Sequence, residues 1–70
     1  MKKETKRERF VRIANKRTNE VLYRLRVLGG CANRRMYEFT DKDKKMIFDA
    51  IEKEVERVKN LFVKKEDFQL

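Results

Sequence analysis

The sequence has no proline, histidine or tryptophan, only one cysteine, and only two glycines among its 70 residues. A single thiol, Cys31, cannot form a disulfide within one chain. Without histidine, one thiol also cannot build a structural zinc site, so we expect no metal and no cofactor. A lone thiol is more typical of a reducing cytoplasm than of a secreted scaffold.

Long hydrophobic runs are absent as well. No apolar segment approaches the length of a membrane span or of a signal-peptide core, so we expect a soluble, cytoplasmic protein that is neither inserted in a membrane nor exported by a signal peptide. Charged residues make up 46% of the chain, which on its own is typical of disorder. However, 40% of the residues are apolar and recur at helical spacing, which predicts a folded, highly helical chain.

The positive charge is concentrated in the first half of the chain. Residues 1–17 carry a net charge of +6, residues 18–40 carry +2, and residues 41–70 carry none, which accounts for the whole net charge of +8. If the charges served only solubility, acidic and basic residues would be balanced along the whole chain, as they are in the last thirty residues. The asymmetry therefore indicates one side of the molecule that faces a polyanion.

Two long helices are predicted, at about 6–28 and 41–63. The first follows a frayed lead (residues 1–4) and a capping box, in which the Thr5 hydroxyl accepts an amide of the first turn and Glu8 reaches back to the Thr5 amide. A left-handed glycine at Gly29-Gly30 is expected to end it. Thr40 and Asp43 form a second capping box, and a short tail (residues 64–70) follows the second helix. In that tail Phe68 continues the apolar face.

Both predicted helices are amphipathic. At 100° per residue, one face of the first helix carries Phe10, Ala14, Val21, Leu25 and Leu28, and one face of the second carries Ile47, Ala50, Ile51, Val55, Val58, Leu61 and Phe62. Two such helices joined by about ten residues predict an all-α antiparallel hairpin, one domain spanning 1–70. A chain this short has little core, so we expect a homodimer that forms a four-helix assembly. The alternative is a monomer in which the connection and the tail cover the open side.

The main candidate site is a basic stripe on the first helix, opposite its apolar face. Its members follow a 3-4-3-4-3 spacing and are Arg9, Arg12, Lys16, Asn19, Tyr23 and Arg26. Cationic side chains at this spacing reach a run of phosphates, while the amide and the phenol are suited to base edges or base stacking. Nucleic acid, DNA or RNA, is the expected partner. The alternatives are a solvated basic face, an acidic protein partner and an anionic membrane surface.

The connection adds two further candidates for phosphate contact, Arg34 and Arg35. Asn33, just before them, is suited to a turn or a local cap. Tyr37 and Phe39 have the spacing to stack on single-stranded bases. The favoured interpretation is that these aromatic residues, with Met36, fold inward and plug the end of the hairpin.

One charge interrupts each apolar face, Arg17 on the first helix and Glu54 on the second. In an antiparallel hairpin the two residues lie at about the same height. A buried guanidinium needs a partner, so we predict a structural Arg17–Glu54 ion pair that fixes the register of the helices.

No pattern indicates an enzyme. The sequence has no glycine-rich phosphate loop, metal-ligand cluster or catalytic triad, and Cys31 lacks a histidine to activate it. A small-molecule substrate is therefore not expected. The competing function is a structural or adaptor protein that binds another protein through an exposed apolar flank, formed by Val11, Leu22, Met46 and Phe48.

Residues 9–62 also carry a recognisable pattern. Its features are Arg17-Thr18-Asn19, Leu25 to Gly29, Asn33, Tyr37-Glu38-Phe39-Thr40 and Ile47-Phe48 with Ala50-Ile51-Glu52. This pattern resembles a group of small, uncharacterised basic helical proteins found on plasmids and other mobile elements of Gram-positive bacteria. The resemblance implies a bacterial cytoplasmic protein and a DNA-linked accessory or regulatory role, and it assigns no site residues.

Overall fold

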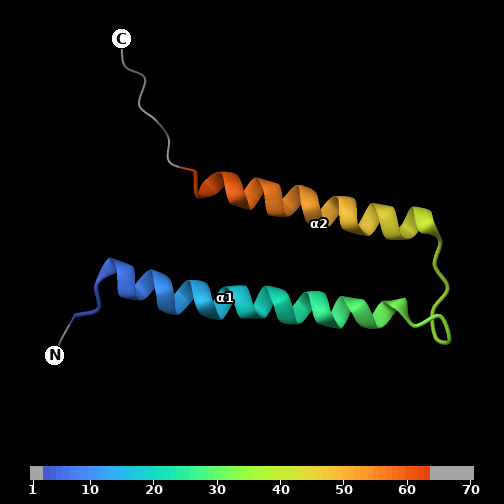
Figure 1. Cartoon of the computed structure of the whole chain (residues 1–70), viewed down its shortest axis with the longest axis horizontal. Helices are drawn as coiled ribbons and strands as arrows, with labels where there is room; N and C mark the ends of the chain where they lie inside the picture. The colour runs from blue at the N-terminus through green and yellow to red at the C-terminus, as the bar shows by residue number, and fades with distance from the viewer. Residues whose placement is uncertain (1–2, 64–70) are drawn as a thin grey trace, which may run out of the picture. The chain divides into compact units, whose positions relative to one another are not determined.

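The computed structural model describes residues 3–63, and all regular structure in that part of the chain is helical (Figure 1). The elements are α1 (Lys6–Gly29), the short 3₁₀ helix η1 (Gly30–Ala32) and α2 (Asp41–Leu61). The chain divides into two units, the first ending at Glu38 and the second beginning at Phe39. The all-α prediction is confirmed, while the antiparallel pairing and the dimer remain predictions.

Helix α1 begins at Lys6, as predicted, because Thr5 caps it. Thr5 has an extended backbone, and its hydroxyl oxygen accepts the amide N–H of Glu8 at 3.0 Å. The other predicted bond of the capping box, from the Thr5 amide to the Glu8 carboxylate, does not form. The Glu8 carboxylate accepts the hydroxyl proton of Thr5 at 3.0 Å, which gives it a charge-assisted bond without reaching back to the Thr5 amide.

The expected left-handed glycine at the end of α1 is also wrong. Gly29 (φ −57°) and Gly30 (φ −63°) are both right-handed, and the described part of the chain contains no residue with positive φ. Instead the helix tightens into η1, where the Gly30 amide bonds the Val27 carbonyl and the Asn33 amide bonds the Gly30 carbonyl. These i→i+3 bonds satisfy the last carbonyls, so no left-handed residue is required.

Asn33 organises the turn that follows η1, as predicted. Its side-chain oxygen accepts the Arg35 amide at 3.0 Å, and its carbonyl accepts the amides of Met36 and Tyr37 at 3.1 and 3.0 Å. The Met36 and Tyr37 side chains are exposed and Phe39 is half-buried. The predicted aromatic plug depends on how the two helices pair, so it remains a prediction.

Helix α2 begins at Asp41 with the complete capping box that the sequence predicts. The Asp43 amide donates to the Thr40 hydroxyl oxygen at 3.1 Å, and the Thr40 amide donates to the Asp43 carboxylate at 2.9 Å. The helix ends at Leu61, two residues before the predicted end, because the amides of Phe62 and Val63 make i→i+3 bonds. The predicted tail, 64–70, with Phe68, lies outside the described residues.

No side chain among residues 3–63 is buried in the structure. On α1, Phe10 and Val21 are 48% and 58% exposed, and on α2 Ile47 and Val55 are 42% and 50% exposed. Near the start of α1 the guanidinium of Arg7 lies 5.7 Å from the centre of the Phe10 ring, a cation–π contact. Each helix therefore presents large apolar side chains that a stable fold must cover.

Candidate nucleic-acid interface

The predicted basic stripe lies on one continuous α-helix. Helix α1 is unbroken from Lys6 to Gly29, so the 3-4 spacing places the stripe residues along one side of it. From Arg9 to Arg26 the stripe is about 26 Å long at ~1.5 Å per residue. All six stripe residues are exposed: Arg9, Arg12, Lys16, Asn19, Tyr23 and Arg26.

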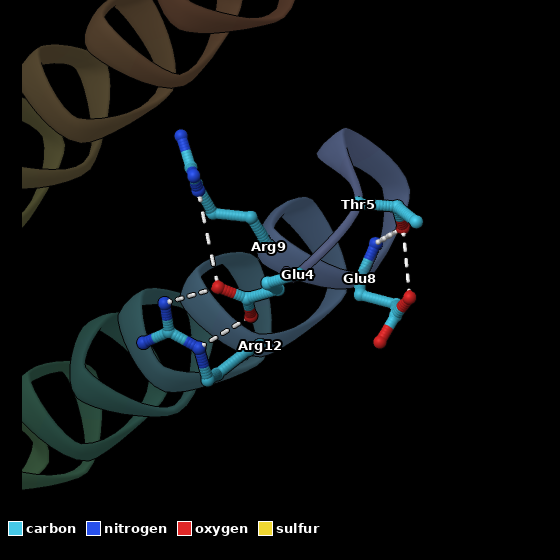
Figure 2. Close-up of polar contacts among 5 residues, drawn as sticks. All are labelled: Glu4, Thr5, Glu8, Arg9 and Arg12. Atoms are coloured by element: carbon cyan, nitrogen blue, oxygen red, sulfur yellow. Dashed lines mark hydrogen bonds and ion pairs between the residues drawn. The ribbon is translucent and has the colours of Figure 1, made fainter. Parts of the chain in front are cut away.

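The N-terminal end of the stripe holds one carboxylate. Arg12 donates from Nε to Glu4 Oε1 at 2.8 Å and from Nη2 to Oε2 at 3.1 Å, a two-bond contact in which both carboxylate oxygens are used (Figure 2). Arg9 Nε lies 3.9 Å from the same Oε2. The hydrogen bond from Arg12 lowers the pKa of Glu4, and the bond to Glu4 raises the pKa of Arg12.

The rest of the stripe is open. Within residues 3–38 no ion pair involves Lys16 or Arg26, and the Tyr23 side chain is 58% exposed. An ammonium and a guanidinium that face solvent are suited to phosphate oxygens. Asn19 and Tyr23 lie between these charges along the helix, where they can contact bases when the cations hold the backbone.

Arg34 and Arg35 lie in the turn after η1 and are exposed. The Asn33 side chain holds the Arg35 backbone in this turn, at 3.0 Å from its amide. The two arginines therefore belong to the same structural unit as the stripe but to a separate local structure beyond its end. They extend the positive charge of the first unit rather than the stripe itself.

The predicted structural ion pair joins residues of different units. Arg17 is exposed on α1, and Glu54 lies on α2, where its carboxylate accepts from Arg57 Nε at 3.0 Å and also from Arg57 Nη2. This bond lowers the pKa of Glu54. The Arg17–Glu54 pair remains a prediction, and the i,i+3 bond to Arg57 gives Glu54 a partner within its own helix.

Glu4 is the site residue that the sequence analysis missed. The sequence predicts that Glu4 belongs to a frayed lead, but the structure shows that it contacts Arg12, eight positions further along the chain. The usual i,i+3 and i,i+4 rules could not find this contact because Glu4 precedes the helix. The only available signal was the isolated acidic residue among the basic residues of the first seven positions.

The boundary between the structural units is also the boundary of the charge. The first unit, up to Glu38, has 12 basic and 4 acidic residues, a net charge of +8. The second unit, from Phe39, has 8 basic and 8 acidic residues and no net charge. The first unit therefore carries the whole net positive charge of the chain.

Comparisons with protein-family models, curated proteins and solved structures give no match. In the part of the chain that the structure describes, neither helix has an apolar stretch long enough to cross a membrane.

Proposed function

We propose that this chain is a small nonenzymatic nucleic-acid-binding protein, an accessory or regulatory factor that contacts phosphates through the basic stripe of α1. The observation that supports the proposal is the unbroken helix Lys6–Gly29, which carries four exposed cations and two exposed polar side chains at 3-4 spacing. The concentration of all +8 charges in the same unit supports it as well.

Binding through phosphates is expected to weaken with rising salt concentration by a predictable amount. Each phosphate that a cation neutralises releases condensed counterions, and log K falls with log salt with a slope of about −0.9 per contact on duplex DNA. If the four stripe cations each contact a phosphate, the slope is about −3.6. A contact made by apolar side chains lacks this steep dependence.

The test is binding of labelled duplex DNA and labelled single-stranded RNA by the full chain across a salt series. The variant replaces Arg12, Lys16 and Arg26 by alanine, and it is expected to weaken binding and to bring the duplex slope to about −0.9. Far-ultraviolet circular dichroism checks that the variant remains helical, which we expect because alanine is the best helix former.

A matched control removes the same charge from the other unit. Lys44, Lys45 and Lys53 are exposed on α2, and their replacement by alanine also lowers the net charge by three. The control is expected to retain most of the affinity and the slope of the original chain. Equal losses in both variants would mean that only net charge matters, and absence of binding to either ligand at low salt would end the nucleic-acid proposal.

The same proposal includes the finer architecture. We infer that α1 and α2 form an antiparallel hairpin, that the Arg17–Glu54 pair fixes its register, and that two copies form a four-helix homodimer. Such a dimer would carry two basic stripes. The exposed apolar residues of both helices support this inference because they need a partner surface. The proposed setting is the bacterial cytoplasm, with a role linked to mobile DNA.

A second candidate function is a structural or adaptor protein. In the hairpin proposed above, its apolar flank would combine exposed residues of α1, Val11 (40%) and Leu22 (43%), with exposed residues of α2, Met46 (63%) and Phe48 (47%). This surface would bind another protein with little salt dependence, since apolar burial rather than counterion release would drive the association. The salt series above separates the two candidates.

A further inference from the structure

At the start of α1, one carboxylate lies between two members of the basic stripe. Arg12 binds both oxygens of Glu4, at 2.8 and 3.1 Å, while Arg9 approaches Oε2 at 3.9 Å from one turn earlier (Figure 2). The Arg9 and Arg12 side chains stay 62% and 64% exposed, whereas that of Glu4 is only 31% exposed. The two arginines thus form an exposed binding site for an anion with two oxygens, and the Glu4 carboxylate occupies this site.

A phosphodiester presents a similar arrangement, since its phosphorus carries two non-bridging oxygens that share one negative charge. The guanidinium donors match carboxylate and phosphate alike, in both cases through two parallel hydrogen bonds. Arg12 uses Nε and Nη2 on Glu4, so the same pair of donors cannot simultaneously hold a phosphate in this way.

We propose that Arg9 and Arg12 form a binding site for a phosphodiester and that the Glu4 carboxylate competes with the phosphodiester for this site. Glu4 must leave the site before the N-terminal end of the stripe binds nucleic acid. This inference rests on the proposed function and adds to it a competition between Glu4 and phosphate at the first contact. Release of Glu4 need not break α1, because Glu4 precedes the helix. The Thr5 cap, with its 3.0 Å bond to the Glu8 amide, does not depend on Glu4.

The test is the affinity of Glu4→Gln for the same labelled duplex DNA at one low and one moderate salt concentration. Loss of the competitor is expected to tighten binding about two- to fivefold, the size that an exposed ion pair allows. The charge-matched control is Glu20→Gln, an exposed position on α1 without an ion pair in residues 3–38. It removes the same charge and is expected to have a smaller effect.

A double variant separates competition from general attraction. When Arg12→Gln is already present, Glu4→Gln is expected to change the affinity for DNA little further, because the main hydrogen-bond partner of Glu4 has been removed. Equal tightening by Glu4→Gln and Glu20→Gln, or the same effect of Glu4→Gln with and without Arg12, overturns the inference and leaves the proposed function standing. If neither the original chain nor Glu4→Gln binds DNA or RNA at low salt, both proposals fail together.

Discussion

Glu4 and Arg12 shift each other's proton affinity, even though both are on the surface. The hydrogen bond between them is the main cause in both cases, and it lowers the pKa of Glu4 and raises that of Arg12. A carboxyl whose pKa is lower in the folded chain than in the unfolded chain stabilises the fold at higher pH. That stabilisation is complete above the ordinary glutamate pKa of about 4.3, and it is lost as the pH falls through the lowered pKa.

The titration of Glu4 tests this contact in solution. We expect the midpoint of its carboxyl resonance, followed by NMR, to lie below the ordinary glutamate value. In Arg12→Gln the midpoint is expected to rise toward that value, because the main cause of the shift is removed. Arg26→Gln, at the other end of the stripe, serves as the control and is expected to leave the midpoint unchanged. Identical midpoints in the original chain and Arg12→Gln would show that the contact does not form.

At the scale of the elements, the predictions of the helix starts succeeded, although the predicted bond from the Thr5 amide to Glu8 did not form. Both helix starts were predicted because Thr5 and Thr40 cap amides only three positions away. The turn at Asn33 was predicted for the same reason. The helix ends were less predictable, since a tightened 3₁₀ turn and a left-handed glycine both satisfy the last carbonyls.

Because Gly29 is right-handed, its substitution by alanine is expected to stabilise the helix, whereas substitution of a left-handed glycine would destabilise it. Gly29 has φ −57°, and a Cβ atom placed on it meets no atom within 4 Å. Gly29→Ala is therefore expected to stabilise α1 by about 0.5–1 kcal/mol, because alanine loses less backbone entropy on folding. Thermal unfolding followed by circular dichroism measures the change.

A left-handed Gly29 would give the contrary result, since alanine at positive φ is strained and the variant would unfold at a lower temperature. Thr18→Ala, inside the same helix, provides a comparison for the effect of alanine in a position that is helical in either case.

At the scale of the whole molecule, two helices of 24 and 21 residues cannot depend on local interactions alone. Isolated helices of ordinary composition are marginal in water, and most helical stability in proteins comes from burial of an apolar face. No side chain among residues 3–63 is buried, so we expect the stabilising contacts to form when the helices pair. The residue pattern predicts which faces meet, but it does not distinguish pairing within one chain from pairing between copies, because the same apolar residues serve both.

Sedimentation equilibrium decides between these two modes of pairing. We expect the mass of two chains at micromolar concentration, with helix content that falls on dilution because dissociation exposes the apolar faces. Val58→Asp places a charge on the apolar face of α2 and is expected to abolish the dimer and most of the helix, since a buried unpaired carboxylate is strongly disfavoured. Asn60→Asp, on the opposite side of α2, adds the same charge and is expected to preserve both. A fully helical monomer that unfolds cooperatively would support the hairpin and overturn the four-helix dimer.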